Sequence, residues 1–165
     1  PEELPEYRVI DMAKDNWRDA RDTLEMDGKL DEPFWTAYNY PRGLRDLRTG
    51  KKPTLQTHFL VRWWNDSLYF GIRCELAEGE SPVVGSKQDN DPAIWQGEHL
   101  ELLIETDRHS YYQIVVNPAG AIIDLDRAVA LSKAYDWSSQ AEVATHIGEN
   151  WPTGSSRRGG PWTLN

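Results

Sequence analysis

A period-two pattern constrains the fold of this chain more than any other feature of its sequence. In the segment TLQTHFLVRWW, which begins at Thr54, every second residue belongs to one set and the residues between them to another. This alternation is typical of a β-strand whose two faces differ. The turn residues NDS follow, and then a second strand-like segment, LYFGIRCEL. Two such segments joined by Asn65-Asp66 predict an antiparallel hairpin.

Further strand-like segments continue this pattern to residue 147. They are HLELLIET, YYQIVVN, AIIDLDR and the weaker AEVATHI, and the C-terminal residues contain the start of one more strand. Before the first hairpin, Asp31 as a cap and Pro33 in a first turn predict a short helical turn. Short strands separated by Asp, Asn, Gly and Pro turns predict an all-β fold, an antiparallel β-sandwich or jelly roll.

The length of the chain favours a simple domain organisation. A chain of 165 residues most simply forms one domain. Residues 1–23 are charged and lack a sustained period, so we expect an N-terminal extension there, with the β-sandwich spanning residues 24–165. The C-terminal part of that domain looks incomplete.

Composition and charge restrict the partners. Aromatic residues make up 11% of the chain, which is typical of a globular protein. A net charge of −9 argues against a nucleic acid and against an anionic membrane surface, because both are bound through clustered Lys and Arg. The single cysteine, Cys74, excludes an internal disulfide and is expected to be a buried, inert thiol. No apolar run approaches the ~18 residues of a membrane span and no signal peptide is evident, while the acidic composition suits an extracellular or periplasmic protein.

The segment DNDPAIWQGEHLELLIET carries the candidate binding site. Trp95 stands where a loop enters a strand, and Glu98 and Glu101 follow it. An indole offers a flat apolar surface to the C–H face of a sugar ring, and carboxylates accept charge-assisted hydrogen bonds from its hydroxyl groups. The alternatives are a tryptophan that packs a loop onto the core and a solvated acidic face.

The alternation within this strand assigns its faces. Leu100, Leu102 and Ile104 are expected to share the core face. Glu101, Leu103 and Glu105 are expected to share the opposite face, whereas Glu98 precedes the regular part of the strand and is not assigned.

Several motifs in order resemble a known family. MDGKLDEPFWTAY, VRWWNDSLYFGIRCEL, IWQGEHLELLIETD, YYQIVVNPAG and WSSQAEVAT together resemble the family 9 carbohydrate-binding modules and their relatives, the DOMON-type domains, over residues 24–147. The resemblance implies a β-sandwich in which Trp95 stacks on a sugar ring and Glu101 hydrogen-bonds its hydroxyl groups. Glu98 occupies a position where the family often has Asp.

The chain departs from the family in two places. The position of a sugar-binding arginine falls near Val115, and we expect Gln113 and Asn117, which alternate with it, to take over its contacts. The C-terminal strand that carries a second stacking tryptophan is not recognisable, so its candidates are Trp151, Trp162 and Trp137. Trp63 or Trp64 could also line the cleft, although one of the two should face the core.

The acidic loop KQDNDP is the candidate metal site. Asp89, Asn90 and Asp91 offer oxygen ligands of the kind that Ca²⁺ prefers, without EF-hand spacing. Because members of the family often carry structural calcium, the resemblance implies such a site, and the alternative is a solvated turn. We expect no other cofactor.

The sequence thus predicts a non-catalytic carbohydrate-binding module attached to a larger polysaccharide-degrading protein. Hydrolysis is disfavoured, because Glu98 and Glu101 at a three-residue spacing in an extended segment would lie on opposite faces. One alternative is a b-type haem electron-transfer domain, known among DOMON relatives, with Met12 or Met26 and His146 as ligands. Another is a structural domain of a surface protein.

Overall fold

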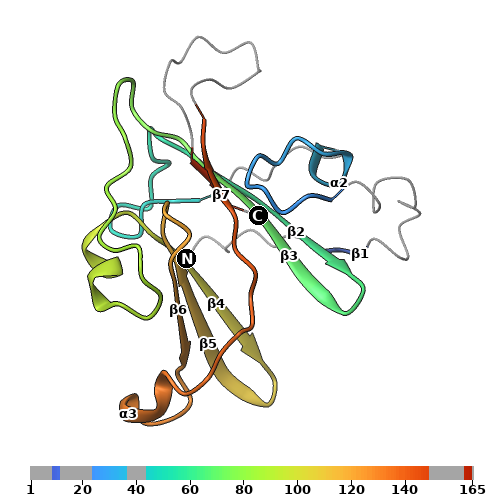
Figure 1. The fold of residues 1–165 in the computed structure, drawn as a ribbon, viewed down its shortest axis with the longest axis vertical. Coiled ribbons are helices and arrows are strands. Elements are labelled where there is room, and N and C mark those ends of the chain that lie inside the picture. The colour runs from blue at the N-terminus through green and yellow to red at the C-terminus, as the bar shows by residue number, and fades with distance from the viewer. Residues whose placement is uncertain (1–8, 12–23, 37–43, 149–161, 165) are drawn as a thin grey trace. The chain divides into compact units, whose positions relative to one another are not determined.

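A computed structural model of the protein describes residues 9–11, 24–36, 44–148 and 162–164. The chain forms two compact units: unit 1 comprises residues 1–80 and 146–165, and unit 2 comprises residues 81–145. Figure 1 traces the elements along the chain. In chain order they are β1 (Ile10–Asp11), α2 (Pro33–Thr36), β2 (Thr57–Trp64), β3 (Ser67–Cys74), η1 (Pro92–Gln96), β4 (Leu100–Thr106), β5 (His109–Val116), β6 (Ile122–Asp126), α3 (Leu131–Ala134), β7 (Thr145–Ile147) and β8 (Trp162–Leu164).

Unit 1 is built on the predicted hairpin. β2 and β3 pair antiparallel, and Asn65 and Asp66 at the turn have φ angles of 50° and 61°. Positive φ at both central residues matches the twist of the flanking strands, and Asn and Asp tolerate it better than most residues. The sheet has the order β1-β2-β3-β8-β7, in which β1 pairs parallel to β2 and β8 pairs antiparallel to β3. The hairpin, the short helical turn at α2 and the C-terminal strand are confirmed.

The segment before β2 covers one face of this sheet. Leu30, Phe34 and Trp35 are buried with Leu60 of β2 in one hydrophobic cluster. The ring of Trp35 lies against Gly71 of β3 so closely that a β-carbon there would come within 2.7 Å of it. Gly71 therefore provides the space for the indole.

The two adjacent tryptophans of β2 have different environments. Trp64 packs against the same cluster, and Trp63 is 39% exposed. One tryptophan of the pair faces the core, as expected. Cys74, at the end of β3, is buried and forms no disulfide.

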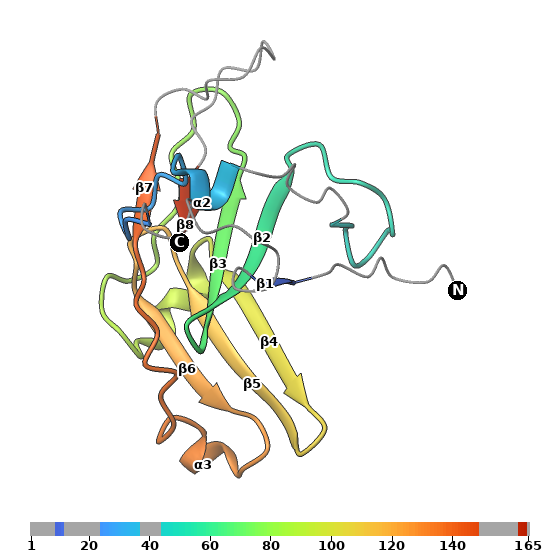
Figure 2. The ribbon, with the colours of Figure 1, turned by 90° about the vertical axis from the view of Figure 1, so that its right-hand side faces the viewer.

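Unit 2 contains a three-stranded antiparallel sheet in the order β4-β5-β6. Figure 2 shows the three strands side by side. The register places Glu101 opposite Val115, and Val115 opposite Ile123. Directly opposite residues share a face of the sheet, so Glu101 belongs to the same face as two core residues.

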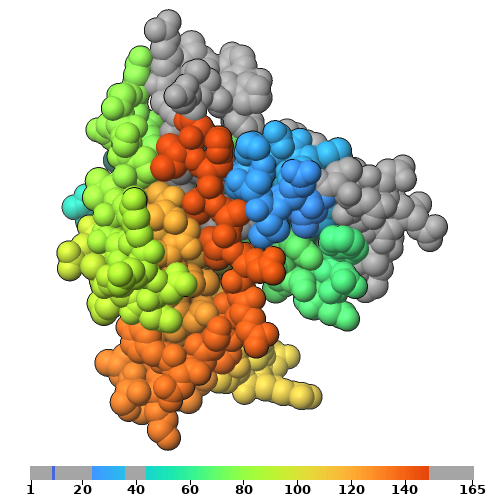
Figure 3. Space-filling view, viewed as in Figure 1, coloured from blue at the N-terminus to red at the C-terminus, as the bar shows by residue number. Residues whose placement is uncertain are grey.

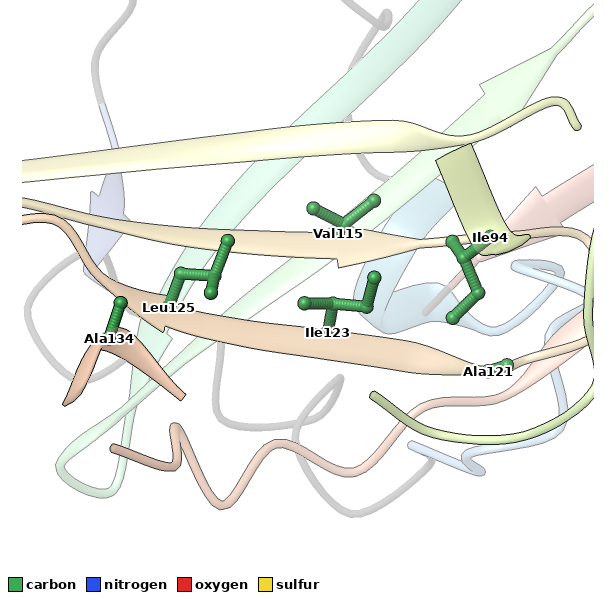
Figure 4. Packing of buried hydrophobic residues seen from close by; sticks show 6 residues of the cluster. All are labelled: Ile94, Val115, Ala121, Ile123, Leu125 and Ala134. Carbon is green, nitrogen blue, oxygen red and sulfur yellow. The ribbon is translucent and has the colours of Figure 1, made fainter. Parts of the chain in front are cut away.

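That face is covered only in part, by the two short helical elements. Figure 4 shows its core, in which Ile94 of η1 and Ala134 of α3 lie at the two ends of a row of strand residues. The cluster consists of Ile94, Val115, Ala121, Ile123, Leu125 and Ala134. Its strand residues come from β5, β6 and the turn between them, whereas Glu101, Leu103 and Glu105 of β4 are exposed. Leu100, Leu102 and Ile104 are partly buried, which confirms the predicted alternation. The core cluster, however, lies on the face of Glu101, which was expected to be the face opposite the core.

The segment after α3 packs on part of the opposite face of the same sheet. Asp124 of β6 is buried and accepts hydrogen bonds from the hydroxyl group of Ser138 (3.2 Å) and from the backbone N–H (3.0 Å) and hydroxyl group (2.8 Å) of Ser139. Trp137 stacks on Tyr112 with ring centroids 4.3 Å apart, and His109 stacks on Tyr112 at 4.2 Å. Trp137 is thus part of the packing of this face.

The prediction of a mostly β, antiparallel architecture is confirmed. In the part of the chain that is described, no helix is long and apolar enough to cross a membrane.

Candidate functional site

The 3₁₀ helix η1 positions Trp95. Asp91 caps the helix: its Oδ1 accepts a hydrogen bond from the backbone N–H of Ala93 (2.9 Å), and its Oδ2 accepts one from the Ser86 hydroxyl (2.6 Å). The two donors, the serine hydroxyl first, hold the pKa of Asp91 below its ordinary value of 3.8. Pro92 occupies the first turn, where its missing N–H costs nothing.

A close contact between two glycines fixes the far end of η1. A β-carbon on Gly85 would lie 1.9 Å from the carbonyl oxygen of Ala93, and one on Gly97 would lie 2.5 Å from the backbone nitrogen of Gly85. The loop and the helix therefore meet backbone to backbone. In the space-filling view the yellow-green segment that carries η1 packs against the orange atoms of the β5–β6 region (Figure 3).

Trp95 is held at the edge of the core of unit 2. It is partly buried and packs against the cluster around Ile94 and Val115. Its ring meets the ring of His99 edge to face, with centroids 5.3 Å apart. The indole is therefore fixed by packing and still retains surface that reaches solvent.

A row of hydrogen-bonded polar side chains begins beside Trp95, and we name His99, Glu101, Gln113 and Arg127 the polar row. His99 Nε2 lies 3.4 Å from Oε1 of Glu101. Gln113 Nε2 donates to Oε2 of Glu101 (2.6 Å). Arg127 Nε donates to Oε1 of Gln113 (2.6 Å). The row crosses all three strands, from the start of β4 to the residue that follows β6.

The polar row presents opposite chemistry at its two ends. Glu101 is exposed, and its carboxylate is an acceptor held in place by two neighbours. Arg127 is partly buried, and among the described residues Gln113 is the one side chain to which its guanidinium is hydrogen-bonded. The terminal nitrogens of a guanidinium are donors only. A ligand on this face would thus meet acceptors at one end and donors at the other.

Two of the predicted ligand-binding residues, Glu98 and Asn117, are engaged in contacts within the protein. Glu98 is partly buried with Oε2 shielded from solvent, and its backbone N–H donates to the carbonyl oxygen of Val83 (2.8 Å). Asn117 is fully buried at the β5–β6 turn. Its Oδ1 accepts from the N–H groups of Ala119 (3.0 Å) and Ala121 (3.1 Å), and its Nδ2 donates to the Ser86 carbonyl (2.6 Å). The structure thus brings Trp95, Glu101 and Gln113 together and gives Asn117 to the turn.

The three residues of the predicted calcium site support the loop before η1. Oδ1 of Asp89 accepts from the backbone N–H of Ile122 (3.0 Å), and the N–H of Asn90 donates to the carbonyl oxygen of Ile122 (2.8 Å). Both carboxylate oxygens of Asp91 accept the hydrogen bonds described above. No group of three or more His, Cys, Asp or Glu side chains suited to a metal ion occurs in the described ranges. Calcium binding stays a prediction.

The remaining candidates are dispersed. Trp151 and Met12 lie outside the described residues, and Trp162 is described only as the first residue of β8. Met26 is partly buried, and His146 is exposed on β7. Trp137 lies on the opposite face of the β4–β6 sheet from Glu101, because its partner Tyr112 alternates with Gln113 along β5.

Sequence reasoning missed His99 and Arg127. His99 stands four residues after Trp95, and only the helical turn of η1 brings the two rings together. Arg127 had a usable signal: pairing YYQIVVN with AIIDLDR across the PAG turn places residue 127 opposite residue 111, on the face of Gln113. Arg127, the residue that follows β6, thus brings a cation to the face of Gln113.

Comparisons of the chain with protein-family models, with curated proteins and with solved structures found no match.

Proposed function

We propose that the chain is a non-catalytic carbohydrate-binding module that stacks a sugar ring on Trp95 and binds its hydroxyl groups through Glu101, which Gln113 holds in place. One observation carries the proposal: the ring of the partly buried Trp95 meets that of His99, and His99 and Gln113 hold the exposed carboxylate of Glu101 in place. The resemblance of the sequence motifs to family 9 carbohydrate-binding modules supports the same reading.

The arrangement suits a sugar for physical reasons. An indole that packs one part against a core loses little freedom when a ring stacks on its remaining surface. A carboxylate held by two neighbours is likewise in position before the ligand arrives, so less conformational entropy is lost on binding. Hydrogen bonds from sugar hydroxyl groups to an ionised carboxylate are stronger than those to a neutral acceptor.

A binding role is favoured over catalysis. A glycosidase needs two carboxyl groups about 5–9.5 Å apart on either side of the scissile bond. Glu98, the partner that Glu101 would need, has Oε2 shielded from solvent. We propose that the module belongs to an extracellular or periplasmic polysaccharide-degrading protein, in which another part performs the chemistry.

We further propose that the two sheets form a β-sandwich. On the β2–β3 hairpin, Phe59, Phe70 and Ile72 share the face opposite Trp35 and are partly or fully buried. On the other sheet, Leu102, Ile114 and Val116 form a second apolar face. A sheet with one apolar face requires a partner layer, and these two faces are suited to each other.

A glycan array with the purified chain tests the carbohydrate-binding proposal. Trp95→Ala and Glu101→Gln should each remove or strongly weaken binding to the glycans that the wild-type chain retains. Glu101→Gln keeps the size and shape of an exposed side chain, and a thermal melt of the variant checks that the fold is retained. Tyr135→Ala, at an aromatic residue that is 42% exposed after α3, is the matched control and should bind as the wild type does. An array without any bound glycan, or full binding by both variants, would refute the proposal.

A further inference from the structure

We infer that the binding surface extends along the β4–β5 strands beyond Trp95, and that its ligand is a linear, neutral saccharide of three or more sugars. The second contact region consists of Leu103, Tyr111 and Arg127, which we name the distal patch. This inference rests on the proposed function and specifies the length and charge of its ligand.

The register of the sheet sets the distance between the two contact regions. Glu101 is opposite Val115, and Leu103 is opposite Gln113, two residues further along. The backbone N–H of Arg127 donates to the carbonyl oxygen of Tyr111 (3.0 Å), which continues the β5–β6 pairing by one residue. From Val115 to Tyr111 is four residues, or about 13 Å at the ~3.3 Å rise of a strand. A single sugar ring on Trp95 is therefore too short to contact Tyr111 as well, the residue of the distal patch that lies farthest along the strand.

The distal patch has the surface that a further sugar requires. Leu103 is 63% exposed and Tyr111 is 36% exposed, so apolar surface is available on the face that carries the polar row. η1 and α3 cover the β6 side of this face, while β4 is the first strand in the order of the sheet. An apolar surface next to hydrogen-bonding groups complements a sugar chain, whose C–H faces and hydroxyl groups alternate along its length.

Arg127 and Gln113 connect the distal patch to Trp95. Nε of Arg127 is bound to Gln113, and its two terminal nitrogens, which have no acceptor among the residues that the structure describes, are donors suited to hydroxyl and ring oxygens. Gln113 is 6% exposed, and its side chain is therefore a fixed link between Glu101 and Arg127. The polar row thus runs beside the proposed ligand from Trp95 to the distal patch.

The charge of unit 2 favours a neutral chain. Residues 81–145 contain four Lys and Arg against ten Asp and Glu. A polyanionic glycan would be repelled by this excess and by Glu101 itself. A neutral glycan can use both the acceptor and the donor ends of the row.

Calorimetric titration of the full chain with oligosaccharides of increasing length tests the inference. The probes are the cello-, xylo- and manno-oligosaccharides of one to six sugars and their parent monosaccharides. We expect affinity for at least one series to rise about tenfold or more between one and four sugars and then to level off. Tyr111→Ala and Arg127→Gln should each remove about five- to tenfold of this gain, as the loss of one aromatic or hydrogen-bonded contact implies. Tyr111→Ala, which lies outside the polar row, should leave the affinity for the monosaccharide unchanged.

Two exposed residues near α3 serve as matched controls. Tyr135→Ala and Leu131→Ala change an exposed aromatic and an exposed leucine in the same unit, and they should alter no affinity in the series. Leu103→Ala should resemble Tyr111→Ala.

The possible failures are distinguishable. Equal affinity for one and six sugars, or an unchanged series for Tyr111→Ala and Arg127→Gln, overturns the extended surface while the proposed function stands. An absence of binding to all the six-sugar chains also overturns the inference. Unchanged binding by Trp95→Ala and Glu101→Gln would instead overturn the proposed function itself.

Discussion

At the scale of single residues, Asp91 determines where Trp95 is held, because its carboxylate joins the loop at Ser86 to the first turn of η1. Its folded pKa lies below the ordinary value of 3.8. The two hydrogen bonds therefore contribute fully to stability above that value and are lost as the pH falls through the lower, folded pKa. We expect the melting temperature of the wild type to drop more between about pH 6 and pH 2 than that of Asp91→Asn, which cannot titrate.

Thermal melts of both proteins across this pH range provide the measurement, and the ¹³C shift of the Asp91 carboxyl group gives the folded pKa directly. Asp27 and Asp46 also have lowered pKa values, and they titrate identically in the two proteins. The difference between the melts therefore isolates Asp91. Identical pH dependence in the wild type and the variant would show that the carboxylate does not stabilise η1.

Single residues also show how far sequence reasoning reached into the site. Trp95, Glu101 and Gln113 could be chosen because an aromatic residue, an acid and an amide stood at positions that alternation or motif singled out. Asn117 looked equivalent to Gln113, since both lie on one parity of the same strand. The β5–β6 turn, however, uses its amide for three hydrogen bonds. Whether a polar side chain is hydrogen-bonded within the fold or left available to a ligand depends on contacts between segments that are distant in the sequence.

At the scale of elements, the placement of η1 depends on the contact between Gly85 and Gly97. We expect Gly85→Ala to destabilise unit 2 by about 1–3 kcal/mol or more, because the new β-carbon would meet backbone that cannot rotate away. Because η1 carries Trp95, glycan binding should weaken as well. Urea unfolding and the glycan assay measure the two effects.

Gly120→Ala in the β5–β6 turn is the control for this prediction. Gly120 has a φ of +81°, and the nearest atom that its β-carbon would meet is 3.7 Å away. Alanine there costs about 1–2 kcal/mol for the backbone conformation alone and adds no clash. Glycan binding equal to the wild type in Gly85→Ala would mean that η1 does not need this contact to hold Trp95.

The elements differ in how clearly the local sequence predicts them. The hairpin at Asn65-Asp66 and the alternation in β4 are local patterns, so they were predicted within a few residues. η1 was expected to be loop, because the five residues PAIWQ are too few to show a period. They become helical through the Asp91 cap and through the burial of Ile94 against β5 and β6. The parallel pairing of β1 with β2 is likewise a long-range contact without a local signal.

At the scale of the whole molecule, the proposed β-sandwich makes the two compact units depend on each other for stability. Each sheet has one face already covered, at least in part, by its own unit: the segment before β2 in unit 1, and η1 and α3 in unit 2. The second apolar faces are buried usefully only if a partner layer excludes water from them. If one unit of a sandwich unfolded alone, the apolar face of the other unit would be exposed to water. A sandwich therefore predicts a single cooperative unfolding transition for the full chain.

Two substitutions test this cooperativity, one in each second apolar face. Ile72 of β3 and Ile114 of β5 are both buried, and Ile→Ala at such positions costs about 2–5 kcal/mol. In a sandwich, either substitution should lower the midpoint of the same calorimetric transition, by roughly 2–4 °C for each kcal/mol in a chain of this size. Two transitions, with Ile72→Ala shifting only one and Ile114→Ala only the other, would show that the units unfold independently. In that case the saccharide site would have to be sought in unit 2 alone, where Trp95 and the whole polar row lie.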